Sequence, residues 1–241
     1  MHSATTPSET SRPGFADFYR INRGGGLFSE TVSQRIGAAF ALAAQRAGLP
    51  PTALTVANLL LGLAVSVTVV ALAAPVAAGD VPAWAVGLLA LVGWHVAYAL
   101  DCADGQLARV TGQRSAAGAR VDVLCDVAAQ IALVTALGAV AVAQRPATPT
   151  WLVAVFAGTW MVNLVTSVMQ AGPNASSMVT STSLPVRLAK LIRDYGAVIF
   201  VAGLVLTVAP ALTFWVVVAF TVVNGGFLLA SITFSARASL R

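Results

Sequence analysis

Four aspartates lie within one short stretch, residues 101–126, of a chain that has few other acidic residues. The stretch reads DCADGQLARVTGQRSAAGARVDVLCD, and Asp101, Asp104, Asp122 and Asp126 make up four of the nine acidic residues of the chain. Long apolar runs flank it on both sides. Carboxylates at the ends of such runs are costly to keep in or near hydrocarbon. Bound divalent cations would stabilise them, so these residue types predict a metal site.

The spacing of these aspartates favours their convergence. Asp101 and Asp104 are three positions apart at the end of one apolar run. Asp122 and Asp126 are four positions apart near the start of the next. Both spacings place a pair on one helical face, and a short turn makes the two helices antiparallel neighbours. Oxygen ligands favour Mg²⁺, Mn²⁺ or Ca²⁺ over zinc. Two such cations would suit a phosphoryl-type displacement, because they can clamp a pyrophosphate and neutralise developing charge.

Small residues and one arginine accompany the aspartates. Gly105 and Ala108 keep the first helix thin beside the acids, and Gly118 does the same on the second. Thin helices let their backbones approach a nucleotide or each other. Arg109 supplies a fixed cation suited to a phosphate group.

The composition limits the kind of protein that positions this stretch. The 241 residues are 58% hydrophobic and only 10% charged. Several apolar runs approach or exceed the roughly 20 residues that cross a bilayer. The runs are continuous rather than alternating, which favours an all-α, polytopic membrane protein over a β-barrel. The net charge of +5 does not indicate nucleic-acid binding, because the basic residues lie at the ends of apolar runs.

Three regions follow from the pattern along the chain. Residues 1–14 form a polar tail that we expect to be disordered, without the apolar segment of a secretory signal. Residues 15–48 form a membrane-surface segment. Residues 49–236 form a catalytic domain with six spans, predicted at residues 53–74, 83–109, 116–143, 150–171, 195–208 and 212–234, with a turn from Pro75 to Pro82.

Within the surface segment, apolar residues recur four apart at Phe28, Val32, Ile36 and Phe40, with polar residues between them. This period predicts an amphipathic helix in the plane of the membrane interface. An ordinary helix packed on protein is the alternative.

The Lys and Arg residues predict the orientation. With a cytoplasmic N-terminus, thirteen of the fourteen Lys and Arg residues lie on the cytoplasmic side, and only Arg145 lies outside. The positive-inside rule therefore predicts a multi-pass protein of the plasma (inner) membrane with both termini in the cytoplasm. The aspartates then lie at the cytoplasmic ends of their helices, where nucleotide-linked substrates are found.

Other polar residues in the apolar runs have more ordinary interpretations. Cys102 and Cys125 lie on the cytoplasmic side, where thiols stay reduced, so we expect no disulfide. His95 is expected to be a packed, hydrogen-bonded side chain. Asn58 and Asn163 either face the pocket or bond across helices.

The key stretch resembles the signature of the CDP-alcohol phosphotransferase (CDP-alcohol phosphatidyltransferase) family. The shared pattern comprises eight fixed positions: Asp101, Asp104, Gly105, Ala108, Arg109, Gly118, Asp122 and Asp126. The six spans and the preceding surface helix also fit this family. The resemblance implies an enzyme of phospholipid biosynthesis. A CDP-linked donor, usually CDP-diacylglycerol, gives its substituted phosphate to an alcohol, and CMP leaves. The family is typically homodimeric.

The resemblance also implies roles for individual residues. The four aspartates would bind two divalent cations, Mg²⁺ or Mn²⁺, and Asp126 would also be the general base for the acceptor hydroxyl. The implied CDP site comprises Asp104, Gly105, Ala108, Arg109 and Gly118. Thr55 joins it through the Pro-x-x-x-Thr pattern of residues 51–55, which the family often has.

Basic residues near the fifth span have two interpretations. Arg187, Lys190 and Arg193 are three apart on one face, where they either orient the chain and contact lipid phosphates or bind an acceptor that carries its own phosphate. Arg114 and Arg120 would add to such a site. Inositol phosphate and glycerol phosphate are acceptors of this kind, and the segment RGGGLFSETVSQRIG is weakly similar to relatives that make inositol phosphodiesters.

Two alternative functions remain open. The same chemistry could use a soluble CDP-alcohol such as CDP-inositol and release a soluble phosphodiester. A divalent-cation transporter would also need membrane carboxylates, but an ion pathway should place them near mid-bilayer and on more than one helix pair. The other four predicted spans carry no acidic residue within their apolar cores.

Overall fold

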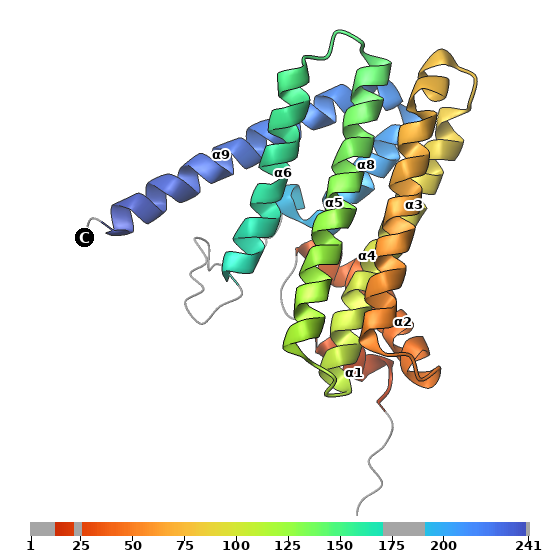
Figure 1. Cartoon of the computed structure of the whole chain (residues 1–241), viewed down its shortest axis with the longest axis vertical. Coiled ribbons are helices and arrows are strands. Elements are labelled where there is room, and N and C mark those ends of the chain that lie inside the picture. The colour runs from red at the N-terminus through yellow and green to blue at the C-terminus, as the bar shows by residue number, and fades with distance from the viewer. Residues whose placement is uncertain (1–12, 22–25, 171–190, 240–241) are drawn as a thin grey trace, which may run out of the picture.

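The computed structural model describes residues 13–21, 26–170 and 191–239, and in this part helices joined by short turns are the regular structure (Figure 1). The first elements are α1 (Phe15–Arg20), a π-helical segment (Ser29–Ser33) and α2 (Gln34–Arg46). The helices that follow are α3 (Pro51–Ala78), α4 (Ala83–Val110), α5 (Ala116–Gln144), α6 (Thr150–Gln170), α8 (Tyr195–Val208) and α9 (Thr213–Ser239). Short 3₁₀ turns at Leu191–Arg193 and Pro210–Leu212 precede α8 and α9.

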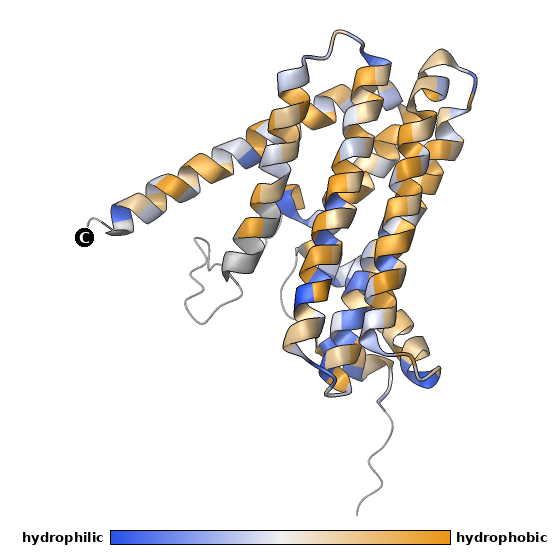
Figure 2. Ribbon diagram, viewed as in Figure 1, coloured by the Kyte–Doolittle hydropathy of each residue, from blue (hydrophilic) through white to orange (hydrophobic). Residues whose placement is uncertain are grey.

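Four of these elements are long and apolar enough to cross a membrane: α3, α4, α5 and the segment Pro210–Arg237, which includes most of α9. Two shorter apolar helices, Thr150–Val162 and Tyr195–Val208, accompany them. Apolar residues run along most of the length of the bundle, and polar residues gather toward the ends of the helices and in part of α4 and α5 (Figure 2). The predicted all-α architecture is therefore confirmed for the described residues, and the length and composition of these helices fit a multi-pass membrane protein.

Capping residues explain where α3, α4 and α5 begin and end. Pro51 occupies the first turn of α3, where a missing N–H does no harm, and Gly79 closes that helix with a left-handed φ of 84°. The Ser115 side chain caps α5 by accepting a hydrogen bond from the Gly118 N–H at 2.9 Å. Gly112, with φ of 70°, allows the tight turn between α4 and α5. These signals end α4 and begin α5 after a tight turn, and α3 is the helix that packs against both of them, so α4 and α5 are not the directly packed pair that the short turn predicted.

The predicted turn from Pro75 to Pro82 is wrong in its first half. Pro75 lies inside α3, which continues to Ala78. A proline disrupts a helix through its missing N–H and its clash with the preceding turn. Here only three helical residues follow it, and the N–H groups of Gly79 and Asp80 bond the carbonyls of Val76 and Pro75. The helix therefore ends at the glycine cap and not at the proline. The last helix also extends further than predicted, to Ser239.

The core has two parts. The larger one lies among the long helices and includes Trp94, Leu137, Phe156, Trp160 and Ile199. The smaller one joins α1 and α2 to α3 and α4, and small side chains predominate in it. Figure 1 shows α3 and α5 running side by side, whereas α9 leans away from the bundle toward its C-terminal end.

The surface segment turns an unexpected face toward the bundle. Its buried residues are small: Ser29, Ser33, Gly37, Ala38, Ala41 and Ala44. A Cβ on Gly37 would lie 2.9 Å from the Cys102 Cβ and 3.0 Å from the Ala99 carbonyl oxygen, so α2 packs closely on α4. Val32 and Ile36 of the predicted apolar face remain exposed, by 37% and 42%. The segment thus packs on protein mainly through small residues, while Val32 and Ile36 face outward and Phe28 and Phe40 are partly buried.

Candidate active site

Three of the predicted carboxylates meet between α4 and α5. Asp101, Asp122 and Asp126 can each offer one oxygen, and these oxygens all lie within 4.8 Å of one another. One oxygen of Asp122 is buried and has no hydrogen-bond partner in the described part of the chain. Carboxylate oxygens this close repel each other unless a cation or a proton lies between them. The donor set is therefore one that a hard divalent cation fits.

Asp104 lies apart from this group of three and is held by α3. It is 5% exposed, and its Oδ2 accepts a hydrogen bond of 2.5 Å from the Thr55 hydroxyl. It is still close enough to interact electrostatically with Asp122 and Asp126. The structure therefore brings three of the four predicted ligands within one cation's reach and leaves the fourth, Asp104, outside that group but close to it.

A polar face of α3 supports the aspartates. Thr55 and Asn58 are each 5% exposed, although they lie in an apolar helix. The Asn58 side-chain amide points to Asp101, with 3.4 Å between its Nδ2 and Oδ1 of the carboxylate. Among the alternatives left by the sequence, Asn58 thus bonds across helices at the site. Its position three residues after Thr55 was the available signal, because that spacing puts both on one face.

Arg109 folds back over its own helix. A Cβ on Gly105 would lie 3.1 Å from both terminal nitrogens of the guanidinium. The space beside Gly105 is thus occupied by the arginine side chain, whose Nε is buried and has no hydrogen-bond partner among the described residues. Ala108 is half-buried beside it. A guanidinium with an unused donor can bind an incoming phosphate.

Gly118 has a local role in the structure. A Cβ there would lie 3.0 Å from the Ser115 hydroxyl oxygen, which caps α5. The glycine therefore keeps space beside the cap at the start of the helix that carries Asp122 and Asp126.

The structure describes only some of the basic residues that are predicted to bind a phosphate on the acceptor. Arg187 and Lys190 lie outside the described residues. Arg114 and Arg120 are exposed near the start of α5, and Arg114 is close enough to Arg109 for electrostatic interaction. The Arg193 guanidinium carbon lies 3.3 Å from the centre of the Phe227 ring, so this arginine contacts α9.

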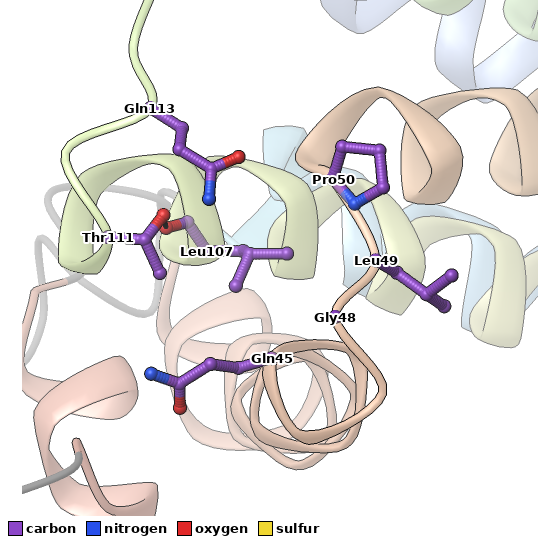
Figure 3. A pocket seen from close by; sticks show the side chains of 7 residues that line it. All are labelled: Gln45, Gly48, Leu49, Pro50, Leu107, Thr111 and Gln113. Atoms are coloured by element: carbon purple, nitrogen blue, oxygen red, sulfur yellow. Dashed lines mark hydrogen bonds between the residues drawn. The ribbon is translucent and has the colours of Figure 1, made fainter.

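A small cavity lies at the same end of α4 as the aspartates. Its volume is about 140 Å³. Figure 3 shows it between the end of α2, the start of α3 and the last turn of α4, lined by Gln45, Gly48, Leu49, Pro50, Leu107, Thr111 and Gln113. This lining includes none of the site residues predicted from the motif. The spacing of apolar residues in the sequence did not predict this cavity.

His95 and the cysteines behave as expected. The imidazole Nδ1 lies 2.7 Å from the Leu91 carbonyl oxygen, and its ring packs edge-on against Phe28 and Phe200. Cys102 and Cys125 are free thiols. These residues are therefore part of the packing around the site.

Sequence reasoning missed a buried acid near the site. Asp194 is 3% exposed and accepts a hydrogen bond from the N–H of Gly196 at the start of α8. An aspartate directly before an apolar run was an available signal for a helix cap. Tyr195, the next residue, packs edge-on against Tyr98 of α4 with ring centres 4.8 Å apart.

Comparison with known protein families identifies this arrangement. A family model described as CDP-alcohol phosphatidyltransferase matches residues 49–224, which run from just before α3 into α9 and include the whole motif. A comparison with curated proteins gives no match. Because the family match covers well over half of the sequence and contains the aspartate cluster, the chain belongs to the CDP-alcohol phosphatidyltransferase family, and it is an enzyme of that family.

Proposed function

We propose that this enzyme transfers a phosphatidyl group from CDP-diacylglycerol to an alcohol, in phospholipid biosynthesis. The oxygen of the alcohol forms a bond to the phosphorus that carries diacylglycerol. The bond between that phosphorus and the CMP oxygen breaks, and CMP leaves with the bonding electrons. The proton of the alcohol passes to a base. The observation that carries this proposal is the convergence of Asp101, Asp122 and Asp126 inside the region that the family model matches.

The donor set supports binding of two divalent cations, Mg²⁺ or Mn²⁺. Asp101, Asp122 and Asp126 would hold them, with Asp104 as the fourth ligand from beside that group. When bound, such cations neutralise the charge of a pyrophosphate and of its leaving oxygen.

Asp126 is proposed to have a second role as the general base. It lies one helical turn after Asp122 on α5, so it shares the pocket with the ligands. A carboxylate there can accept the proton of an alcohol held within hydrogen-bond distance.

The CDP moiety is proposed to lie along the last turns of α4 and the start of α5. Arg109 offers its half-buried guanidinium to a phosphate, and this requires it to move from the space beside Gly105. Ala108 and Gly118 leave room along the two helices, and Thr55 holds Asp104 in place from α3.

A phosphate on the acceptor would meet basic residues. Arg114 and Arg120 are exposed near the motif. Arg193, with Arg187 and Lys190 before it, is proposed to contribute from the other side. The packing of Arg193 on Phe227 leaves it a less direct candidate than Arg114, because its guanidinium already contacts α9.

The proposed membrane arrangement has six spans. The four long apolar helices and the two shorter ones supply them. With both termini in the cytoplasm, the aspartates open to the cytoplasmic face of the plasma membrane, and thirteen of the fourteen Lys and Arg residues lie on that side. The enzyme is proposed to act as a homodimer, as its family does.

One experiment tests the reaction and its alternatives. Purified enzyme receives CDP-diacylglycerol labelled in its lipid part, Mn²⁺ and a panel of alcohols and alcohol phosphates, and both CMP and labelled product are measured. Manganese-dependent CMP release with a labelled lipid product is the expected result. If CMP appears only when a soluble CDP-alcohol replaces the lipid donor, the phosphatidyl reaction is wrong. Cation flux in liposomes without CMP release from any donor would indicate a transporter.

A further inference from the structure

Asp194 is a buried carboxylate outside the motif, and backbone and hydroxyl donors surround it. Its Oδ2 accepts hydrogen bonds from the N–H groups of Phe28 at 2.7 Å and Ser29 at 3.0 Å. Its Oδ1 accepts from the Gly196 N–H at 3.1 Å and from the Ser29 hydroxyl. A buried charge is costly without such partners, so this contact is specifically built.

The same carboxylate caps two helical elements. It precedes α8 as its N-cap, and it binds the N–H groups at the start of the π-helical segment Ser29–Ser33. N–H groups at helix starts have no partner within their own helix, and a negative charge there is favourable. Residues 165 positions apart in the sequence are thereby joined at one point. π-Helical turns are rare and are often found at functional sites.

Two glycines make this junction possible. A Cβ on Gly26 would overlap the side chain of Asp194. A Cβ on Gly196 would lie 2.9 Å from Phe28 and from the Ser29 hydroxyl oxygen. Neither position therefore has room for a side chain, because the side chains of Asp194, Phe28 and Ser29 occupy that space.

A hydrogen-bonded chain leads from this junction to α4. The Tyr98 hydroxyl donates to the Ser29 hydroxyl oxygen at 3.0 Å, and Ser29 in turn donates to Asp194. Each hydroxyl donates in the same direction, toward the charge, and such chains strengthen each member.

Tyr98 lies one helical turn before Asp101, so the two side chains share a face of α4. The rise between them is about 4.5 Å. Tyr98 and Asp101 are close enough to interact electrostatically, and Asn58 approaches Asp101 from α3. The turn that carries this metal-ligand candidate is thus held from two sides.

We propose that Tyr98, Ser29 and Asp194 form a positioning relay, which orients the turn of α4 that carries Asp101 and so sets the affinity of the aspartate cluster for a divalent cation. The inference rests on the proposed metal-dependent function. None of the three residues belongs to the motif. Ser29 and Asp194 act on the site through Tyr98, which lies on the same face of α4 as Asp101.

The test measures Mn²⁺ binding to the purified, metal-stripped full chain without substrate, by the electron paramagnetic resonance signal of free Mn²⁺. The variants are Tyr98→Phe, Ser29→Ala and the double variant. Each single variant is expected to weaken Mn²⁺ binding by about tenfold. Loss of a group that orients a metal ligand typically lowers metal affinity by about 10- to 100-fold, and this is the lower end of that range. The double variant should be no weaker than either single one, because both break one chain.

Tyr19→Phe is the matched control. It removes a tyrosine hydroxyl that donates to the Glu30 carbonyl of the same π-helical segment at 3.2 Å, without removing a member of the relay. Its Mn²⁺ affinity should match that of the wild type. Thermal unfolding of each metal-free protein tests whether the compared variants are equally folded.

The outcomes separate the relay from the reaction. Unchanged Mn²⁺ affinity in both Tyr98→Phe and Ser29→Ala, or an equal loss in Tyr19→Phe, overturns the relay and leaves the transfer reaction standing. A wild type that binds no Mn²⁺ overturns the relay and the metal site together. If the wild type binds Mn²⁺ but releases no CMP, the proposed reaction is wrong, and the affinities of the variants still support or overturn the relay.

Discussion

At the scale of single residues, the carboxylates of α5 carry the proposed chemistry. We expect Asp122→Asn and Asp126→Asn each to reduce CMP release by at least about 100-fold, because an amide neither binds the cation well nor accepts the alcohol proton. The measurement is CMP release by purified protein at saturating substrates. Asp80→Asn, an exposed aspartate in the turn between α3 and α4, is the control and should retain full activity. Wild-type activity in either α5 variant would refute the assignment.

Thr55 offers a second test at this scale, because its hydroxyl donates to Asp104 at 2.5 Å. Thr55→Val keeps the shape and removes the donor, whereas Thr55→Ser keeps the donor. Hydrogen bonds to charged groups contribute about 1.5–3 kcal/mol, so kcat/KM should fall by about tenfold or more in Thr55→Val. Thr55→Ser should stay close to the wild type. Equal losses in the two variants would show that the methyl group, and not the hydroxyl, is what matters.

At the scale of elements, close packing of α2 on α4 keeps the surface segment in place. Gly37→Val would place its Cβ 2.9 Å from Cys102 and 3.0 Å from the Ala99 carbonyl. Overpacking of this kind destabilises by about 1–3 kcal/mol, so the midpoint of thermal unfolding in detergent should fall.

Ala39→Val is the matched control for that substitution, because Ala39 is exposed on the same helix. Its unfolding midpoint should remain near that of the wild type. If both variants unfold at the wild-type temperature, α2 is not packed on α4 as closely as the structure has it.

At the scale of the whole molecule, the orientation in the membrane decides where the site opens. We expect an impermeant maleimide added to intact cells to label Ala147→Cys, in the exposed turn between α5 and α6, and not Gln113→Cys, in the turn between α4 and α5. The positive-inside rule predicts this difference. Permeabilised cells should label both positions, which controls for accessibility. The reverse pattern in intact cells would invert the topology.

Metal removal tests the complete enzyme. Stripping with EDTA should stop CMP release, and added Mn²⁺ should restore it, because the clustered carboxylates need a cation to hold a pyrophosphate. Thermal unfolding before and after the cycle controls for irreversible damage. Full turnover in excess chelator would contradict the metal-dependent reaction.

Much of the fold was accessible from the sequence, because its signals are local. Continuous apolar runs, Pro51, Gly79 and Ser115 mark the helices, and each acts through near neighbours in the chain. The prediction at Pro75 was wrong, because a proline disturbs the turn before it without having to end the helix, and here the glycine cap at Gly79 ends α3.

The site was only partly accessible in the same way. The spacing of Asp122 and Asp126 on one helix, and a short turn back to Asp101, sufficed to predict that they meet. The structure was needed to show that Asp104 turns to Thr55 on α3, which is 49 positions away.

The sequence by itself determined the class of protein, the aspartate pattern and the course of most helices. The tertiary structure alone decided which face of α2 is buried, how Asp194 joins the π-helical segment to α8, and that Ser29 links this junction to Tyr98. The reason is physical. Helix periods and caps depend on residues a few positions apart, whereas these contacts join segments that only the packing of the whole bundle brings together.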